Sequence, residues 1–448
     1  MITQPEALPD ALRDERLARV AERLAPGDVM VLPGAPHRLR SRDTEYPYRP
    51  DSELYWLTGL TEPDALVVVR GGEEPMPALF LRSRDPEVEL WTGERPDPAA
   101  LGEALGAAEV HPSEDVGRVL PGLLDGAGTV YFRLGAHPDV EPAVVEALRR
   151  ARRRGQRQGT GPRAVVDPGE ILDDLRVVKD DWEVAQIRRA AAVTLQAFRD
   201  MAAVLRPGVP EWELQAVLEA GFRRLGSGGP AYETIVGTGA NACTLHYVRN
   251  DRVAGPGEMV LVDAGAAWGL YAADVTRTWP VDGTWTPEQR ALVTVVDSAR
   301  AAAVERIAPG VTVAEVHDAA VWVLTEGLVE LGVLAGTVEE LVAEEAHRPF
   351  YPHQTSHWLG LDVHDPGDYA REGRSRRLEP GMVLTVEPGL YLPGAVVEGV
   401  AGANPFRDMG VRLEDDVLVT PDGHENITAA LETTPAAVED ALARGGEV

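Results

Sequence analysis

Residues 259–277 read Met259-Val-Leu-Val-Asp263-Ala-Gly-Ala-Ala-Trp268-Gly269-Leu-Tyr-Ala-Ala-Asp274-Val-Thr-Arg277. Two strand-like runs flank a short turn, which we predict to be centred on Trp268-Gly269. In a hairpin symmetric about that point, Asp263 and Asp274 lie directly opposite each other on one face, with Cβ atoms roughly 4.5–5.5 Å apart. Two carboxylates placed in this way repel each other, so they point into solvent, share a proton or bind a cation. The apolar run before Asp263 indicates a buried strand, which disfavours solvent.

A second chemical stretch is a cluster of histidines. It reads His353-Gln-Thr-Ser-His357-Trp-Leu-Gly-Leu-Asp-Val-His364-Asp365 and holds three of the chain's ten histidines. A lone histidine is usually structural. A cluster beside Ser, Gly and Asp, in a stretch with little helical character, is typical of metal ligation or proton transfer.

Two further acids belong to strand-like segments near the C-terminus. Glu387 ends an apolar strand just before Pro388, and a carboxylate at the end of a buried strand needs a partner. Arg412 and Glu414 are two positions apart, so they share a strand face. Taken singly, these acids also fit a salt bridge to an arginine and an exposed acidic strand.

Together these segments offer four carboxylates and one imidazole as metal ligands: Asp263, Asp274, His357, Glu387 and Glu414. Such an oxygen-rich set without a thiolate suits manganese, with cobalt, iron or zinc as rivals. Four carboxylates match two divalent ions in charge. Two ions ~3.5–4 Å apart and bridged by water would generate a hydroxide at neutral pH and polarise a carbonyl group.

The order and spacing of these five residues resemble those of the M24 metallopeptidases of the pita-bread fold. Five short sequence motifs are similar to those of Xaa-Pro aminopeptidase, also called aminopeptidase P. They are LVDAG, DVTRTWP, SHWLGLDVHD, LTVEPGLY and VRLEDD. Residues 48–63 (YRPDSELYWLTGLTEP) resemble that family's non-catalytic N-terminal domain. The resemblance covers nearly the whole chain. It implies an α/β protein with an N-terminal α/β domain, residues 1–172, and a catalytic pita-bread domain with pseudo-two-fold halves, residues 173–448.

The resemblance also implies a role for each ligand. Asp263 would chelate one ion, and Asp274 and Glu414 would bridge both. His357 and Glu387 would complete the other site, with Glu387 taking a proton from the bridging water.

Four more residues match the family's substrate-handling positions. His246 would help to hold the substrate and the tetrahedral intermediate, His364 would contact the carbonyl beside the scissile bond, and His353 would line the pocket. Arg412 would steady Asp263 together with Tyr391. Gln354 stands where the family usually has glycine, so the family's backbone shape is not carried over at His353.

An internal repeat is consistent with two related halves. Leu205-Arg-Pro-Gly-Val-Pro-Glu-Trp-Glu-Leu214 resembles Ile307-Ala-Pro-Gly-Val-Thr-Val-Ala-Glu-Val316. In both, a helix ends at Pro-Gly, a new amphipathic helix begins, and strand-like segments come later. We expect each half to be made of helices followed by strands, with a site where the halves meet.

The first part of the chain alternates helical and strand patterns. The stretch at 149–163 is basic and glycine-rich, which indicates a helix end and a linker. A second domain opens near Asp173, and Asp180 and Glu183 fit the start of its first helix. Before the linker we expect a helix at Asp10–Leu24 and strands at Asp28–Leu32, Ala65–Arg70, Ala78–Arg82, Glu87–Trp91 and Thr129–Leu134.

The composition and net charge of the chain limit the kinds of partner that it can bind. The chain has 448 residues and a formal net charge of −29, which repels nucleic acid and anionic membranes. Neither a signal peptide nor an apolar run of the ~18 residues needed to span a membrane is recognisable. With one cysteine, Cys243, no intramolecular disulfide forms, which fits a cytoplasmic location. From the resemblance we expect a homo-oligomer, dimer or tetramer.

The expected reaction is hydrolysis of the bond between any N-terminal residue and a penultimate proline in peptides. The closest alternative is prolidase, which cleaves Xaa-Pro dipeptides on the same fold with the same ligands. Methionine aminopeptidases lack a matching N-terminal domain, and creatinase-like relatives lack the ligand set. More remote alternatives are a cysteine hydrolase using Cys243 and His246, and a non-catalytic peptide-binding protein.

Overall fold

A computed structural model of the chain describes residues 6–72, 77–158 and 160–445. The chain divides into two compact units, Ala7–Asp174 and a second that begins at Leu175. No described helix is long and apolar enough to cross a membrane. Each unit is described separately below.

The N-terminal unit is built on a six-stranded sheet with strand order β6-β5-β4-β1-β7-β8. Strand β4 is antiparallel to β1 and β5, and the remaining pairs are parallel, so five strands share one direction. Its elements are α1 (Asp10–Arg23), β1 (Val29–Pro33), β2 (Leu39–Ser41), β3 (Thr44–Glu45), α2 (Ser52–Thr58), β4 (Leu66–Arg70), β5 (Ala78–Leu81), α3 (Pro86–Thr92), α4 (Pro98–Ala104), β6 (Glu109–Pro112), η1 (Ser113–Asp115), α5 (Val116–Leu123), β7 (Thr129–Tyr131), α6 (Glu141–Gln158) and β8 (Ala164–Val166). Helix α7 (Gly169–Val177) contains the boundary between the units.

The apolar side chains of this sheet alternate between two faces. Val29 and Val31 of β1 pack in one core with Leu120 of α5 and Val144 of α6. Because side chains along a strand point alternately to the two faces, β1 contributes apolar side chains to both faces of the sheet. The prediction of a helix near Asp10–Leu24 and of strands β1, β4 and β5 is confirmed, and the last predicted strand ends at Tyr131 instead of Leu134.

The predicted strand at Glu87–Trp91 is wrong, because this segment is helix α3. The side chain of Asp85 accepts hydrogen bonds from the backbone N–H groups of Glu87 and Val88, and Pro86 occupies the first turn. An acceptor side chain followed by proline is a strong helix start, and here it outweighs the strand-like pattern. None of the helix's residues is buried.

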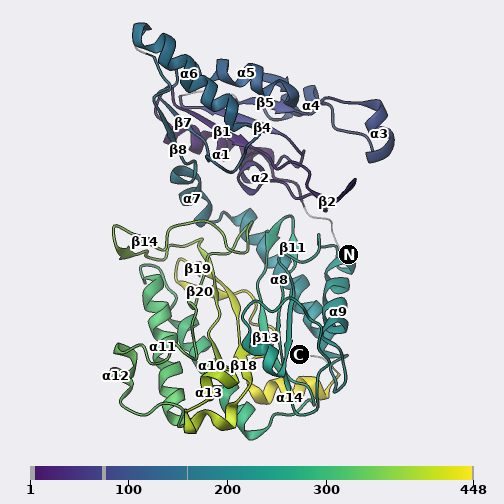
Figure 1. Ribbon diagram of the computed structural model, residues 1–448, viewed down its shortest axis with the longest axis vertical. Helices are drawn as coiled ribbons and strands as arrows, with labels where there is room; N and C mark the ends of the chain where they lie inside the picture. The colour runs from purple at the N-terminus through teal and green to yellow at the C-terminus, as the bar shows by residue number, and fades with distance from the viewer. Residues whose placement is uncertain (1–5, 73–76, 159, 446–448) are drawn as a thin grey trace. The chain divides into compact units, whose positions relative to one another are not determined.

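The C-terminal unit has two halves, each with a helix pair followed by strands. The first half holds α8 (Asp181–Ala202), α9 (Glu211–Arg224), β9 (Ile235–Thr238), η2 (Gly239–Cys243), β10 (Met259–Asp263), β11 (Ala267–Trp268), β12 (Tyr271–Ala272) and β13 (Thr276–Pro280). The second holds α10 (Pro287–Arg306), α11 (Val313–Glu330), α12 (Val338–Ala343), β14 (Ala370–Arg371), β15 (Arg374–Ser375), β16 (Val383–Val386), β17 (Gly389–Leu392), α13 (Gly394–Val397), η3 (Ala401–Phe406), β18 (Met409–Arg412), β19 (Asp415–Thr420), β20 (Gly423–Asn426) and α14 (Pro435–Ala443). In Figure 1 the strands β13, β18, β19 and β20 of this unit lie between α9 on one side and α11 on the other.

The repeated sequence pattern corresponds to this repeated structure. Helices α8 and α10 both begin with a capping box, formed by Asp180 with Glu183 and by Thr286 with Gln289. In each half the first helix packs against the second, and a three-stranded antiparallel sheet follows, with strand orders β13-β10-β9 and β16-β19-β20. The expectation of two related halves is therefore confirmed.

The hairpin that carries the two aspartates turns one residue later than predicted, which shifts each pairing partner by two residues. Asp263 pairs with Thr276, and Trp268 pairs with Tyr271, so the turn is Gly269-Leu270 and not Trp268-Gly269. Both turn residues have positive φ, 56° and 72°, as a two-residue hairpin turn requires. The predicted direct opposition of Asp263 and Asp274 is thus wrong. Because the shift is an even number of residues, both still belong to the same sheet face.

Gly265 permits the close approach of the two chains between the aspartates. A Cβ atom at this position would lie 1.7 Å from the carbonyl oxygen of Ala273. At Gly228, in contrast, a Cβ atom would lie 3.6 Å from the carbonyl oxygen of Ala267, an ordinary contact.

We therefore predict that Gly265→Ala destabilises the C-terminal unit and that Gly228→Ala does not. Overpacking of this kind costs about 3 kcal/mol or more, because the backbone must move. The midpoint of thermal unfolding should fall by roughly 5 °C or more for Gly265→Ala. Equal midpoints for the two variants would contradict the close approach.

Candidate metal centre

One cavity of about 430 Å³ in the C-terminal unit is lined by every site residue predicted from the sequence. These residues are Asp263, Asp274, His357, Glu387 and Glu414, the predicted ligands, and His246, His353, His364 and Arg412. Tyr232 and Gln354 also line it. Residues far apart in the sequence therefore meet in one place.

The acidic side chains of this cavity come from both halves of the unit. Asp263 is the last residue of β10, and Asp274 lies just before β13. Glu387 follows β16 and Glu414 precedes β19, each where its strand ends. Strand ends give these side chains fixed backbone positions while their carboxylates project beyond the sheet.

His357 lies in an irregular segment that is attached to β16. Its backbone N–H donates to Oγ1 of Thr385 at 3.1 Å, and its carbonyl accepts from the Thr385 N–H at 2.9 Å. The Nδ1 atom of the imidazole is 3.1 Å from the carbonyl oxygen of Trp358 and donates to it. This hydrogen bond fixes the ring so that Nε2 faces the acids, an arrangement usual for metal-binding histidines.

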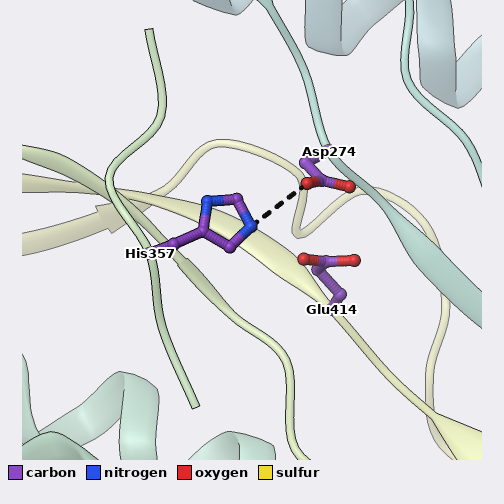
Figure 2. Close-up of side chains that lie close together, drawn as sticks. All are labelled: Asp274, His357 and Glu414. Carbon is purple, nitrogen blue, oxygen red and sulfur yellow. Dashed lines mark ion pairs between the residues drawn. The ribbon is translucent and has the colours of Figure 1, made fainter. Parts of the chain in front are cut away.

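Asp274, His357 and Glu414 form the tightest group of donors (Figure 2). Each offers one ligand atom, and these atoms all lie within 4.8 Å of one another. Nε2 of His357 is 3.3 Å from Oδ2 of Asp274 and 3.6 Å from Oε1 of Glu387. A single divalent ion fits among donors at these spacings.

The acids of the cavity are buried and repel one another. Burial first, and then the charges of Asp274 and Glu387, raise the pKa of Glu414 well above its usual value. Burial also raises the pKa of Asp263, and raises that of Glu387 to about 7. A buried group of carboxylates ionises at neutral pH only with cations beside it, so the donor chemistry fits divalent metal.

The negative charges of the same carboxylates also change the pKa of the His357 imidazole. Burial lowers its pKa, but the hydrogen bond to Asp274 and the charge of Glu387 outweigh burial and raise the pKa to about 9. The carboxylates thus favour a positive charge at this position. A metal ion bound to Nε2 takes the place of that proton.

Tyr232 connects the two aspartates. Its hydroxyl oxygen is 2.7 Å from Oδ1 of Asp263 and 2.5 Å from Oδ1 of Asp274. Burial, and then the charges of both aspartates, raise the pKa of Tyr232 well above its usual value, so the hydroxyl keeps its proton as a donor. Sequence reasoning missed this residue, because no local pattern marks a tyrosine 31 positions before its partner.

Arg412 holds the second carboxylate oxygen of Asp263. Its guanidinium donates to Oδ2 of Asp263 at 2.6 Å, to the hydroxyl of Tyr391 at 2.9 Å and to Oγ1 of Thr276 at 3.2 Å. The Thr276 hydroxyl in turn donates to Oε2 of Glu414 at 2.6 Å. One cation thereby orients two carboxylates, one of them through Thr276, which sequence reasoning also missed.

The three remaining histidines differ in how tightly they are held. Nε2 of His353 is 2.8 Å from the Tyr391 hydroxyl, and burial lowers the pKa of His353 to about 4. His364 packs edge-on against His357, with ring centroids 4.5 Å apart, and its side chain is exposed to the cavity, as is that of His246. Neutral His353 belongs to the wall, while the other two imidazoles remain accessible.

Cys243 does not fit a nucleophilic role. Burial raises the pKa of its thiol to about 12, so the thiol is protonated at neutral pH. A catalytic cysteine requires the thiolate, which a lowered pKa provides. The cysteine hydrolase alternative is therefore unsupported.

Comparison with known proteins agrees with this geometry. Residues 185–421 match the metallopeptidase family M24, and residues 14–131 match the aminopeptidase P N-terminal domain. Xaa-Pro aminopeptidase of Escherichia coli is 39% identical over 427 residues, covering 95% of this chain and 96% of that protein.

Solved structures are similar over nearly the full length. Aminopeptidase PepP of Pseudomonas aeruginosa superposes with a TM-score of 0.93 at 41% identity and covers 99% of both chains. The zinc-substituted aminopeptidase P of Escherichia coli, in complex with product, superposes with a TM-score of 0.93 at 37% identity, covering 98% of this chain and 99% of that one. The expected two-domain α/β architecture with a pita-bread domain is thereby confirmed.

We predict that Tyr232→Phe lowers the affinity for manganese by about tenfold or more, because the aspartates lose the donor that orients them. Metal titration of the stripped protein measures this. Tyr247→Phe is the matched control, since the Tyr247 hydroxyl also lies between two acids, 2.9 Å from both Glu211 and Asp251, outside the cavity. An unchanged affinity for Tyr232→Phe would show that its hydroxyl does not support the metal centre.

Proposed function

The chain belongs to the M24 metallopeptidases and has their aminopeptidase P type of N-terminal domain, and from this premise we propose that it is a Xaa-Pro aminopeptidase. It hydrolyses the bond between an N-terminal residue and a penultimate proline. The observation that carries the proposal is the meeting of four carboxylates and His357 in one cavity beside two accessible imidazoles.

Five side chains would hold two divalent ions, most simply manganese: Asp263, Asp274, His357, Glu387 and Glu414. The oxygen-rich donor set favours manganese over softer ions, and four carboxylates balance the charge of two ions. When bound, the ions activate water and polarise the substrate carbonyl. Cobalt, iron and zinc are alternatives for the same donors.

The chain's own residues then orient the substrate and move protons. Glu387 takes the proton of the attacking water and returns it to the departing nitrogen. His246 holds the substrate as the carbonyl carbon becomes tetrahedral, and His364 donates to the carbonyl beside the scissile bond. His353 and Arg412 position the Tyr391 hydroxyl and Asp263.

Proline at position two sets the chemistry of the leaving group. Its nitrogen has no N–H before cleavage and its ring fixes φ, so a site for it needs a proton source but no acceptor at that nitrogen. Glu387 supplies this proton. Its Oε1 atom lies 3.6 Å from Nε2 of His357.

The cavity lining favours an aminopeptidase over a dipeptidase. A prolidase must recognise the free carboxylate beside proline, usually with a positioned arginine. Of the described residues lining the cavity, Arg412 is the single arginine, and it is engaged by Asp263 and Tyr391. Arg374, Arg376, Arg377 and Arg407, near the motifs in sequence, do not line it.

Three expectations rest only on the family resemblance and on the composition of the chain. We expect a homo-oligomer, a cytoplasmic location and no nucleic-acid or membrane partner. The net charge of −29 supports the last of these.

We predict that the protein cleaves Ala-Pro-Ala at least as well as Ala-Pro and fails on Ala-Ala-Ala. The measurement is kcat/KM for the three peptides with manganese present, and a chelator should abolish all cleavage until manganese is restored. Strong preference for Ala-Pro would make the enzyme a prolidase. Cleavage of Ala-Ala-Ala at a similar rate would remove the proline requirement.

We also predict that His364→Ala lowers kcat by about 10²–10³-fold, the usual loss for a donor to a reacting carbonyl. Metal content should stay at the wild-type value, because His364 is not among the proposed ligands. Metal analysis of the same samples checks this. Loss of an ion from the variant would reassign His364 as a ligand.

A further inference from the structure

A second cavity, of about 460 Å³, lies within the N-terminal unit. It follows the carboxyl ends of β1, β5 and β6 and the loop after β7, through Gly34, Arg82, Ser113 and His137. The amino end of the antiparallel strand β4 contributes Asp64. Neither the metal centre nor its chemistry involves these residues.

The cavity lies where ligands bind in open α/β sheets. From β1 the chain proceeds to β4, β5 and β6 on one side, and then returns to β7 and β8 on the other side of β1. Loops that leave neighbouring strands in opposite directions open a crevice at the carboxyl edge of the sheet. The loops after β1 and β7 line the cavity at this point.

Two hydrogen-bond donors in the lining are buried without a partner. They are Nε of Arg82 and the hydroxyl of Ser113, although another nitrogen of Arg82 donates to Glu62 at 3.3 Å. A buried donor without an acceptor is costly, at about 1–3 kcal/mol, and a fork-shaped guanidinium beside a hydroxyl suits a carboxylate. The pair therefore indicates a ligand that brings acceptor oxygens.

The rest of the lining disfavours a strongly anionic ligand, because it holds more acids than bases. Asp64, Glu114 and Asp139 line the same cavity, against one further arginine, Arg38, and would repel a phosphate dianion. They suit a cationic amine. Pro33, Pro36 and Pro138 supply apolar surface in the same lining.

We propose that this cavity binds a small zwitterion, a free amino acid or a dipeptide, with its carboxylate on Arg82 and Ser113 and its amine toward the acids. The inference rests on the N-terminal unit alone and does not depend on the proposed catalytic function.

The test is hydrogen–deuterium exchange of the full-length, manganese-loaded protein with L-proline and with glycylglycine, read by mass spectrometry. Because exchange is followed segment by segment, binding in the N-terminal unit is distinguished from binding at the metal centre. We expect protection of residues 33–38, 80–84 and 136–140 that saturates with ligand. Sodium acetate and sodium phosphate should protect these segments far less.

Two variants probe the donors, and a third serves as the control. Arg82→Lys keeps the charge but loses Nε, and Ser113→Ala loses the hydroxyl, so each should weaken the protection by about tenfold. Arg118→Lys is matched to the first, since Arg118 lies on α5, pairs with Asp115 and does not line the cavity. Absence of protection by both zwitterions, or equal protection by phosphate, would overturn the proposal, as would variants that bind like the control.

Discussion

The mutual repulsion of four buried carboxylates is the constraint on which the C-terminal unit depends. Asp263, Asp274, Glu387 and Glu414 line one cavity, where burial weakens the screening of their charges. The Arg412 guanidinium and the Tyr232 hydroxyl hold individual oxygens in place, but one arginine cannot balance four acids. The fold therefore fixes the acids on strand ends, and the remaining charge must come from bound cations.

The features that could be predicted from the sequence are those that neighbouring residues determine. The proposed ligands were identifiable because each lies at a strand end or beside glycine and proline within a short sequence motif. The hairpin register was not, because the turn uses Leu270 with φ at 72°, a conformation that leucine disfavours and that sequence patterns do not predict. Helix α3 was missed because the strand-like pattern of residues 87–91 conflicts with the helix start that Asp85 and Pro86 form before it.

Contacts between distant positions were beyond sequence reasoning. Tyr232 and Thr276 act on acids 31 and 138 positions away, and neither residue type is unusual where it stands. The same holds for Arg82 and Ser113, which β5 and β6 bring to one edge of the N-terminal sheet. A pattern within one segment carries no information on which segments will be neighbours, whereas resemblance to a family does.

The two halves of the C-terminal unit each supply acids to one cavity, so ion binding and the docking of the halves share one equilibrium. By mass action, each bound ion adds about 1.4 kcal/mol to the folded state for every tenfold rise in free ion above its dissociation constant. The stability of the C-terminal unit would thereby depend on the concentration of free divalent metal.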